Sequence, residues 1–195
     1  VAVIDARGTA ANHTGSRNIR EAGGRVGRWY AAQANLMARS TVWDAMGRAF
    51  ETAPGDLAER LLAALEAAQR EGGDIRGRQS AVLIVVSGDR SLPPWEKIFD
   101  LRVEDSADPI GELRRLVRVA RAYQAANHGD ELVTRGQVDS AISAYAAAEA
   151  ILPDSAVNGE LVYWHAVTLA DRGRVQPVVA MWAANGLLGL CGLWR

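Results

Sequence analysis

The chain of 195 residues has one cysteine, almost no net charge and no targeting pattern. A single Cys191 excludes an internal disulfide and a cysteine-rich metal centre. The 22 basic and 23 acidic side chains nearly cancel, so no summed field attracts nucleic acid or an anionic membrane. We therefore expect neither kind of partner. No signal pattern is visible, the true N-terminus is expected to lie upstream, and the expected location is the cytoplasm.

Motifs for metals and nucleotides are also missing. His13, His128 and His165 are far apart and have no metal-ligand spacing. The chain has no phosphate loop ending in Gly-Lys-Ser/Thr and no dinucleotide fingerprint that opens a helix after a strand. The sequence therefore predicts no metal and no cofactor, and it leaves the oligomeric state open.

Residues 175–194 carry no charge, and a stretch of this length has to be compared with a membrane span. Gln176, Pro177, Asn185 and three glycines are unfavourable in a lipid-facing helix. We expect instead a packed helix followed by an apolar terminal strip, and no membrane partner.

The first third of the chain alternates as strands do. Residues 1–5 and 9–14 flank Gly8 and predict a hairpin. A second strand pair is expected to follow, including a strand at 29–35 whose backbone is closely approached by its neighbours.

Helical spacing follows. Trp43, Met46 and Phe50 recur at intervals of three and four residues, which predicts one amphipathic helix. Leu57, Leu61 and Leu65 recur in the same way beyond Pro54-Gly55 and predict a second helix that buries this stripe.

Two further strands are indicated. The apolar run 81–86 is typical of a strand that is covered on both faces and central in a sheet. In the strand that ends at Val103, Asp100 and Arg102 share one face. These two side chains either bind a polar ligand or pair with each other, and the simple pair is the preferred interpretation.

Beyond Asp108-Pro109, an N-cap followed by a first-turn proline, the pattern is helical to the end of the chain. Small and aromatic residues in this part stand at the offsets of a tetratricopeptide repeat, which needs small residues where helices cross closely. They are Gly129, Leu132, Gly136, Ala141, Tyr145, Ala148 and Pro153.

A second and more degenerate copy of the repeat follows. It consists of Ala166, Leu169, Gly173, Val178 and Trp182. Two such repeats either offer a surface to a peptide or protein partner or form a helical cap on the preceding domain. The cap is the preferred interpretation, because two repeats offer little groove, and His165 between aromatics is expected to be packed rather than catalytic.

Three segments resemble a family of uncharacterised microbial proteins with the N-terminal-nucleophile (Ntn) hydrolase fold, known as domain of unknown function 1028. They are Tyr30-Ala-Ala-Gln-Ala-Asn-Leu-Met37, Gly72-Gly-Asp-Ile-Arg-Gly-Arg-Gln-Ser-Ala81 with the strand after it, and Asp100-Leu-Arg-Val-Glu-Asp-Ser-Ala-Asp-Pro109. The resemblance runs from residue 1 to about residue 121.

The resemblance implies an α+β protein: part of an αββα sandwich at residues 1–121, then an all-α tetratricopeptide-like tail at 122–195. An Ntn hydrolase uses the side chain of its first residue as nucleophile, so that residue is Thr, Ser or Cys. Val1 has no such group. We therefore expect a fragment that is inactive by itself, because the nucleophile lies in a segment upstream.

Residues that line a site are expected at the glycine-rich turn before the 81–86 strand. Asp74, Arg76, Gln79 and Ser80 converge there as a ligand shelf. The alternative is structural: Asp74 pairs with Arg76, and the other two satisfy backbone groups. Asn35 is the candidate donor to an oxyanion, although an Asn beside a turn is often only a local hydrogen-bond partner.

Two functions follow from these residues. The first is an amide or peptide hydrolase in the complete protein, with Asn35 and the 74–80 turn at the substrate. The second is a binding or scaffolding protein whose helical repeats recruit a peptide, a protein or cell-wall material. The mature first residue distinguishes them, because only Thr, Ser or Cys supports the enzyme.

Overall fold

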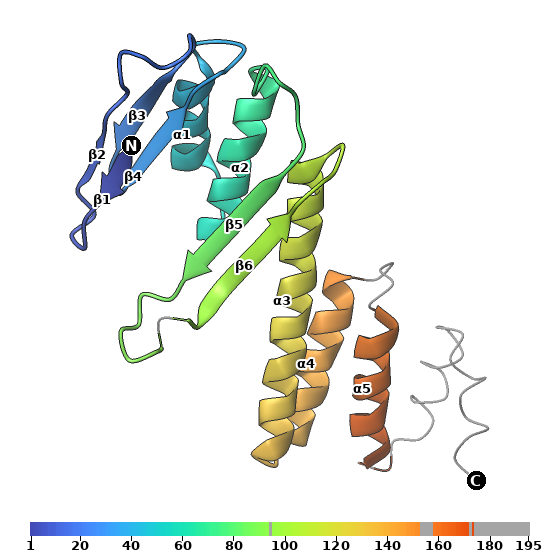
Figure 1. The fold of residues 1–195 in the computed structure, drawn as a ribbon. Coiled ribbons are helices and arrows are strands. Elements are labelled where there is room, and N and C mark those ends of the chain that lie inside the picture. Colours follow the sequence, from blue (N-terminus) through green and yellow to red (C-terminus); the bar gives the residue numbers. More distant parts are fainter. Residues whose placement is uncertain (94, 153–157, 172, 174–195) are drawn as a thin grey trace. The chain divides into compact units, whose positions relative to one another are not determined.

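The computed structural model describes residues 1–93, 95–152, 158–171 and 173. Its strands are β1 (Ala2–Ile4), β2 (Ala10–Asn12), β3 (Gly23–Gly27), β4 (Tyr30–Ala34), β5 (Ala81–Val86) and β6 (Lys97–Val103). Its helices are α1 (Val42–Thr52), α2 (Leu57–Arg70), α3 (Pro109–Thr134), α4 (Val138–Ile151) and α5 (Asn158–Asp171). Helices and small antiparallel sheets together make a mixed α and β protein (Figure 1).

The chain divides into two compact units, Val1–Arg114 and Arg115–Arg195. This boundary falls inside α3, and so does the boundary that the sequence places at residue 121. All six strands of the described residues belong to the first unit.

The strands of the first unit form three antiparallel pairs, β1–β2, β3–β4 and β5–β6. The predicted hairpin at the start of the chain is present, and so is the second strand pair. The expected close approach occurs at Gly24: a Cβ there would lie 2.8 Å from the carbonyl oxygen of Ala32 and 2.5 Å from the side chain of Asn12. Only glycine therefore fits between these neighbours.

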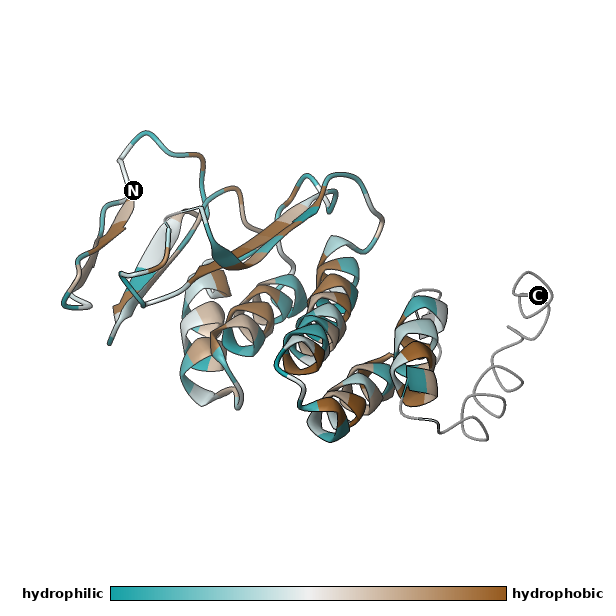
Figure 2. Ribbon diagram, turned by 90° about the horizontal axis from the view of Figure 1, so that it is seen from below, coloured by the Kyte–Doolittle hydropathy of each residue, from teal (hydrophilic) through white to brown (hydrophobic). Residues whose placement is uncertain are grey.

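Helices α1 and α2 lie on one side of the strands (Figure 2). The core between them contains Tyr30, Ala32, Phe50 and Ala64. The rings of Tyr30 and Phe50 lie 4.9 Å apart. Helix α2 begins after Asp56, whose carboxylate accepts a hydrogen bond from the backbone N–H of Glu59 at 3.1 Å, as a good N-cap does.

The predicted buried stripe of α2 is wrong in part. Ala58, Leu62, Ala64 and Ala67 are the buried residues of this helix, whereas Leu57 is 48% exposed. Alanines allow a close approach to a neighbouring helix, so α2 buries its small residues against α1. The leucine row at 57, 61 and 65 is left only partly covered.

The expectation that 81–86 is a central strand covered on both faces is also wrong. Leu83 and Val85 are buried, but Val82, Ile84 and Val86 are 50%, 45% and 58% exposed. Among the described residues β5 pairs only with β6, and no layer covers its outer face. The apolar run therefore forms a strand whose second face is exposed in the described part of the chain.

An N-cap hydrogen bond and a pair of salt bridges hold the start of α3. Asp108 accepts a hydrogen bond from the backbone N–H of Gly111 at 3.3 Å, which confirms the predicted N-cap. Arg114 contacts two carboxylates one above the other on α2, Glu59 at 3.0 Å and Glu66 at 2.7 Å.

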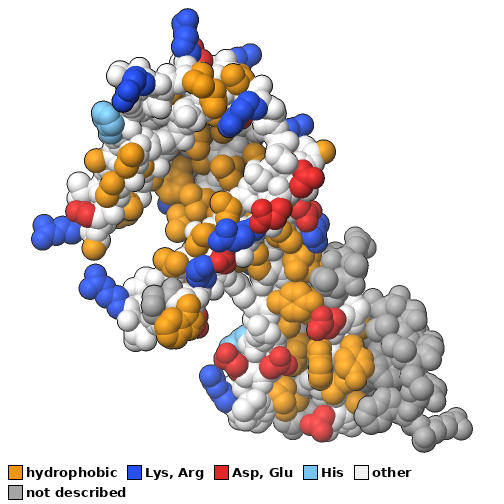
Figure 3. Space-filling view, viewed as in Figure 1, with side chains coloured by type: hydrophobic (Ala, Val, Ile, Leu, Met, Phe, Trp, Pro, Cys, Tyr) orange, Lys and Arg blue, Asp and Glu red, His pale blue; other side chains and the backbone are white. Residues whose placement is uncertain are grey.

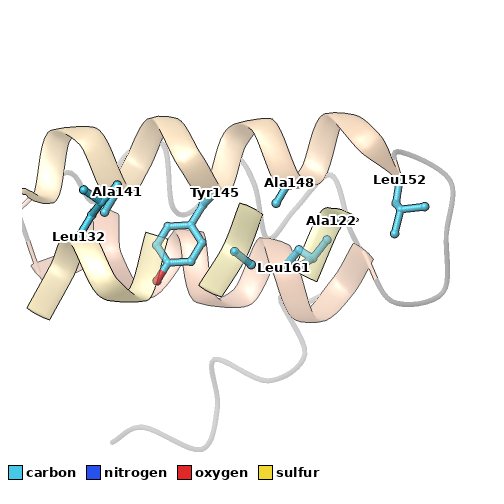
Figure 4. Packing of buried hydrophobic residues seen from close by; sticks show 8 residues of the cluster. Ala122, Leu132, Ala141, Tyr145, Ala148, Leu152 and Leu161 are labelled. Carbon is cyan, nitrogen blue, oxygen red and sulfur yellow. The ribbon is translucent and has the colours of Figure 1, made fainter. Parts of the chain in front are cut away.

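The second unit is helical over its described residues, and its core is an apolar cluster (Figure 4). The cluster includes Leu132, Ala141, Tyr145 and Ala148, which are positions of the predicted repeat. A Cβ on Gly129 would lie 2.9 Å from the ring of Tyr145, so the small residue is required there. Pro153, Val178 and Trp182 of the predicted repeats lie outside the described residues.

None of the helices in the described part of the chain has the length and hydropathy of a membrane span. The charge-free stretch 175–194 lies outside that part.

Candidate functional site

The turn that follows α2 is held at a defined place. Met37 forms an antiparallel bridge with Asp74. On either side of it, the backbone N–H of Ala38 donates to Gly73 O at 2.9 Å and that of Ile75 donates to Leu36 O at 2.9 Å. Gly77 has φ 107, a conformation that residues with a side chain rarely adopt. The turn before β5 thus has a fixed base and a bend that requires glycine.

Asp74 and Arg76 form a bidentate ion pair within this turn. The Nε of Arg76 lies 2.9 Å from Asp74 Oδ1, and its Nη2 lies 2.6 Å from Asp74 Oδ2. Asp74 Oδ1 also accepts the backbone N–H of Arg76 at 2.8 Å. The hydrogen bonds from the Arg76 side chain are the main cause that lowers the pKa of Asp74 to about 2.

A hollow of about 930 Å³ opens beside the turn. All four predicted ligand residues, Asp74, Arg76, Gln79 and Ser80, line it. The structure therefore brings the predicted residues together, and it also shows the ion pair on which the structural alternative depends. The hollow is referred to below as the turn pocket.

Sequence reasoning missed two charged residues of the turn pocket, Arg78 and Asp105. Arg78 follows Gly77 in the same turn, so its position in the sequence was a usable signal. Asp105 approaches from the segment after β6, where the backbone N–H of Ser106 donates to Gln79 O at 2.9 Å. The position of Asp105 at the pocket depends on the pairing of β5 with β6, so no pattern of neighbouring residues could predict it.

Asp100 and Arg102 lie elsewhere, on the exposed face of β6. Arg102 Nη2 lies 3.1 Å from Asp100 Oδ1, and Lys97 also pairs with Asp100. The hydrogen bond from Lys97 is the main cause that lowers the pKa of Asp100. Asp100 and Arg102 therefore form the simple pair that was the preferred interpretation, and Lys97 is a second cation paired with Asp100.

Asn35 is exposed and comes directly after the end of β4. It is not among the residues that line the turn pocket. Its role as an oxyanion donor stays a prediction, because the other reacting groups would have to come from outside the described residues.

A polar network that the sequence did not reveal joins β3, β4 and α1. Tyr30 donates its hydroxyl proton to Glu51 Oε1 at 2.6 Å, and Arg25 Nε donates to the Tyr30 oxygen at 2.9 Å. Arg25 also pairs with Glu51 at 2.8 Å. Desolvation of the phenol is the main cause that raises the pKa of Tyr30. The network anchors α1 to the strands and faces no described pocket.

His165 is buried, as expected for a packed histidine. Its Nδ1 lies 2.8 Å from Glu149 Oε1, and its ring stacks on Tyr145 at 6.1 Å between centroids. Within the described ranges, no three His, Cys, Asp or Glu side chains gather as they would around a metal ion.

Comparisons with known proteins assign the first unit to a protein family. The model of a family of unknown function, DUF1028, matches residues 1–113. The crystal structure of protein SPO2555 from Silicibacter pomeroyi, itself assigned to DUF1028, is similar to this chain with 34% sequence identity and a TM-score of 0.52. The match covers 61% of this chain and 50% of that one, so the chain spans about half the length of its solved relative. No curated protein matches. The chain therefore belongs to the DUF1028 family of unknown function.

Proposed function

We propose that the turn pocket binds a small zwitterionic ligand with the chemistry of a short free peptide, which carries an ammonium group at one end and a carboxylate at the other. The observation that carries the proposal is the lining of the pocket, which combines two arginines and two acids with the side-chain amide of Gln79 and the hydroxyl of Ser80. A lining of mixed charge favours a ligand that carries both signs over a simple anion or cation.

Arg78 is the residue that would hold the ligand carboxylate. Its partner Asp108 lies 4.0 Å away, at the outer limit of an ion pair, and the Arg78 side chain is 48% exposed. Arg76, in contrast, is already bound by Asp74 through two hydrogen bonds. A guanidinium presents paired N–H donors that match a carboxylate, so Arg78 is suited to a bidentate contact.

Asp105 is the counterpart that would hold the ligand ammonium group. It lines the same pocket, and the carboxylate of Asp74 is already neutralised by Arg76. Gln79 and Ser80 line the same pocket and offer a donor and an acceptor each, which suits the amide between the two ends of such a peptide.

The reaction that we propose for the complete protein is hydrolysis of an amide bond, as the resemblance to Ntn hydrolases implies. In such a protein the first unit is part of an αββα sandwich, and the nucleophile is supplied by a segment that this chain does not include. Asn35 would then donate its side-chain amide to the oxyanion. These assignments rest on the family resemblance and on the exposed position of Asn35.

Calorimetry of the full 195-residue chain with glycylglycine tests the proposal. We expect a millimolar affinity, because the pocket is open and makes few contacts. Arg78→Gln should weaken binding at least fivefold by removing the carboxylate contact. The matched control is Arg39→Gln, an exposed arginine that does not line the pocket.

A dipeptide blocked at both ends separates charge recognition from amide recognition. The zwitterion should bind at least fivefold better than the blocked form. Equal binding of both forms, or an equal loss of affinity in Arg78→Gln and Arg39→Gln, would contradict the proposal.

The second function that we propose is partner binding by the helical unit, and one observation favours it. Tyr163, Trp164 and Val167 share a face of α5 and are 37%, 50% and 38% exposed. An exposed aromatic face at helical spacing is typical of a surface for a peptide or protein. If this unit binds a partner as tetratricopeptide repeats do, Trp164→Ala should abolish capture of that peptide or protein. The melting temperature of the variant should stay unchanged.

A further inference from the structure

Part of the lining of the turn pocket is apolar, and the charged groups assigned above to the two ends of a ligand make no use of it. Three elements of the first unit supply this part, α2, β5 and the first turn of α3. The residues are Leu65, Ala81, Val82, Pro109 and Ile110, and they are called the apolar wall below.

Ion pairs bring the α2 and α3 parts of the apolar wall together. Arg114 on α3 lies 2.7 Å from the carboxylate of Glu66 on α2. Ile110 precedes Arg114 by one helical turn, so the two side chains share a face of α3. Leu65 is the neighbour of Glu66 in α2. The ion pair therefore holds Ile110 on the side of α3 that faces α2, where Leu65 lines the same pocket.

The apolar wall keeps surface that a ligand could cover. Val82 is 50% exposed, while Leu65 and Ile110 are only partly buried. Figure 3 shows hydrophobic side chains beside charged ones of both signs on the face of β5 and β6. A ligand without side chains, such as glycylglycine, would satisfy the charges but leave the apolar wall in contact with water.

We propose that the turn pocket prefers a dipeptide whose C-terminal residue has an apolar side chain, such as leucine; this inference rests on the proposed function of the pocket. Arg78, which would hold the carboxylate, lies 4.0 Å from Asp108, the residue before Pro109. The carboxylate end of the ligand is therefore beside the α3 part of the apolar wall. Covering apolar surface favours binding in proportion to the area removed from water.

Calorimetry of the full chain with glycylleucine and leucylglycine tests the proposal. The two dipeptides have the same atoms and charges and differ only in the end that carries the side chain. We expect glycylleucine to bind at least fivefold more tightly than either leucylglycine or glycylglycine. Its heat capacity change on binding should be more negative than that of glycylglycine, because burial of apolar surface lowers this quantity.

Two variants of β5 distinguish the apolar wall from the rest of the strand. Val82→Thr replaces a methyl group by a hydroxyl and keeps the branched shape that suits a strand. The ratio of glycylleucine affinity to glycylglycine affinity should fall at least threefold. Val86→Thr is the matched control, because Val86 is 58% exposed, shares the face of Val82 and does not line the turn pocket. Its ratio should equal that of the unaltered chain.

Three results would overturn the proposal: glycylleucine that binds no more tightly than glycylglycine, equal affinities of glycylleucine and leucylglycine, or an equal change of the ratio in both variants. Glycylglycine binding that depends on Arg78 would leave the proposed function standing in each of these cases. If no dipeptide shows binding that depends on Arg78, both the proposed function and the preference for an apolar residue are wrong.

Discussion

At the residue scale, the pair of Asp74 and Arg76 gives the turn a defined response to acid. The pKa of Asp74 is lowered to about 2, below the value of about 3.9 that an unfolded chain gives. The stabilising contribution of the pair is therefore fully present above about pH 4 and is lost as the pH falls towards 2. Titration of the Asp74 side-chain carbon by NMR should show this low pKa.

The variant Arg76→Gln removes the largest cause of the shift, so the pKa of Asp74 should rise towards 3.9. A wild-type Asp74 that titrates near pH 4 would contradict the bidentate geometry, as would a variant that leaves the titration unchanged.

Gly129 is the residue that sets the helix spacing in the second unit. A methyl group at this position would lie 2.9 Å from the Tyr145 ring, which is itself buried. Gly129→Ala should therefore lower the free energy of unfolding by about 1–3 kcal/mol through overpacking. Thermal denaturation measures the change.

Gly159 is the matched control for Gly129. A Cβ there meets no atom within 4 Å, and the residue lies in the first turn of α5. Gly159→Ala should leave stability unchanged or raise it by up to about 1 kcal/mol, because alanine favours the helix. Equal destabilisation by both changes would show that Gly129 is not a special position.

At the element scale, Arg114 joins the start of α3 to α2. Glu66 and Glu59 raise the pKa of its guanidinium, Glu66 through the largest contribution. Arg114→Met keeps the aliphatic stem but removes both ion pairs. Because the side chain is 39% exposed, solvent screens these pairs and the expected cost is about 1 kcal/mol, or about 2–4 °C in melting temperature.

Arg48→Met is the control for this element, since Arg48 is an exposed arginine of α1. It should change the melting temperature by less than half as much. Similar losses in both variants would mean that the ion pairs with α2 contribute nothing of their own.

The elements also show how far sequence reasoning reaches. Local signals located the helices of the described chain well, because periodicity, the Asp108 cap and the glycine at 136 act over a few residues. The burial of α2 and β5 was predicted wrongly. Apolar runs indicate that a face is suited to burial, but whether another layer covers that face depends on residues that are distant in the sequence.

At the scale of the whole molecule, the same limit applies to the site. Asp74, Arg76, Gln79 and Ser80 could be predicted because one turn carries them all. Asp105 could not, because β6 brings it back from a distant part of the sequence. The DUF1028 match over residues 1–113 includes both the turn and Asp105, so all of the charged residues of the turn pocket belong to the matched region.

The central claim is that the turn pocket recognises a peptide-like zwitterion, and mapping of amide chemical shifts tests it most directly. In a titration of the labelled chain with glycylglycine, the amides of Gly77, Arg78, Gln79 and Ser80 should shift together and saturate with one dissociation constant. Asp105 should shift with them, because it lines the same pocket from another segment. Shifts that are absent there, or that gather instead on α5, would contradict the account and point to the helical unit as the binding part.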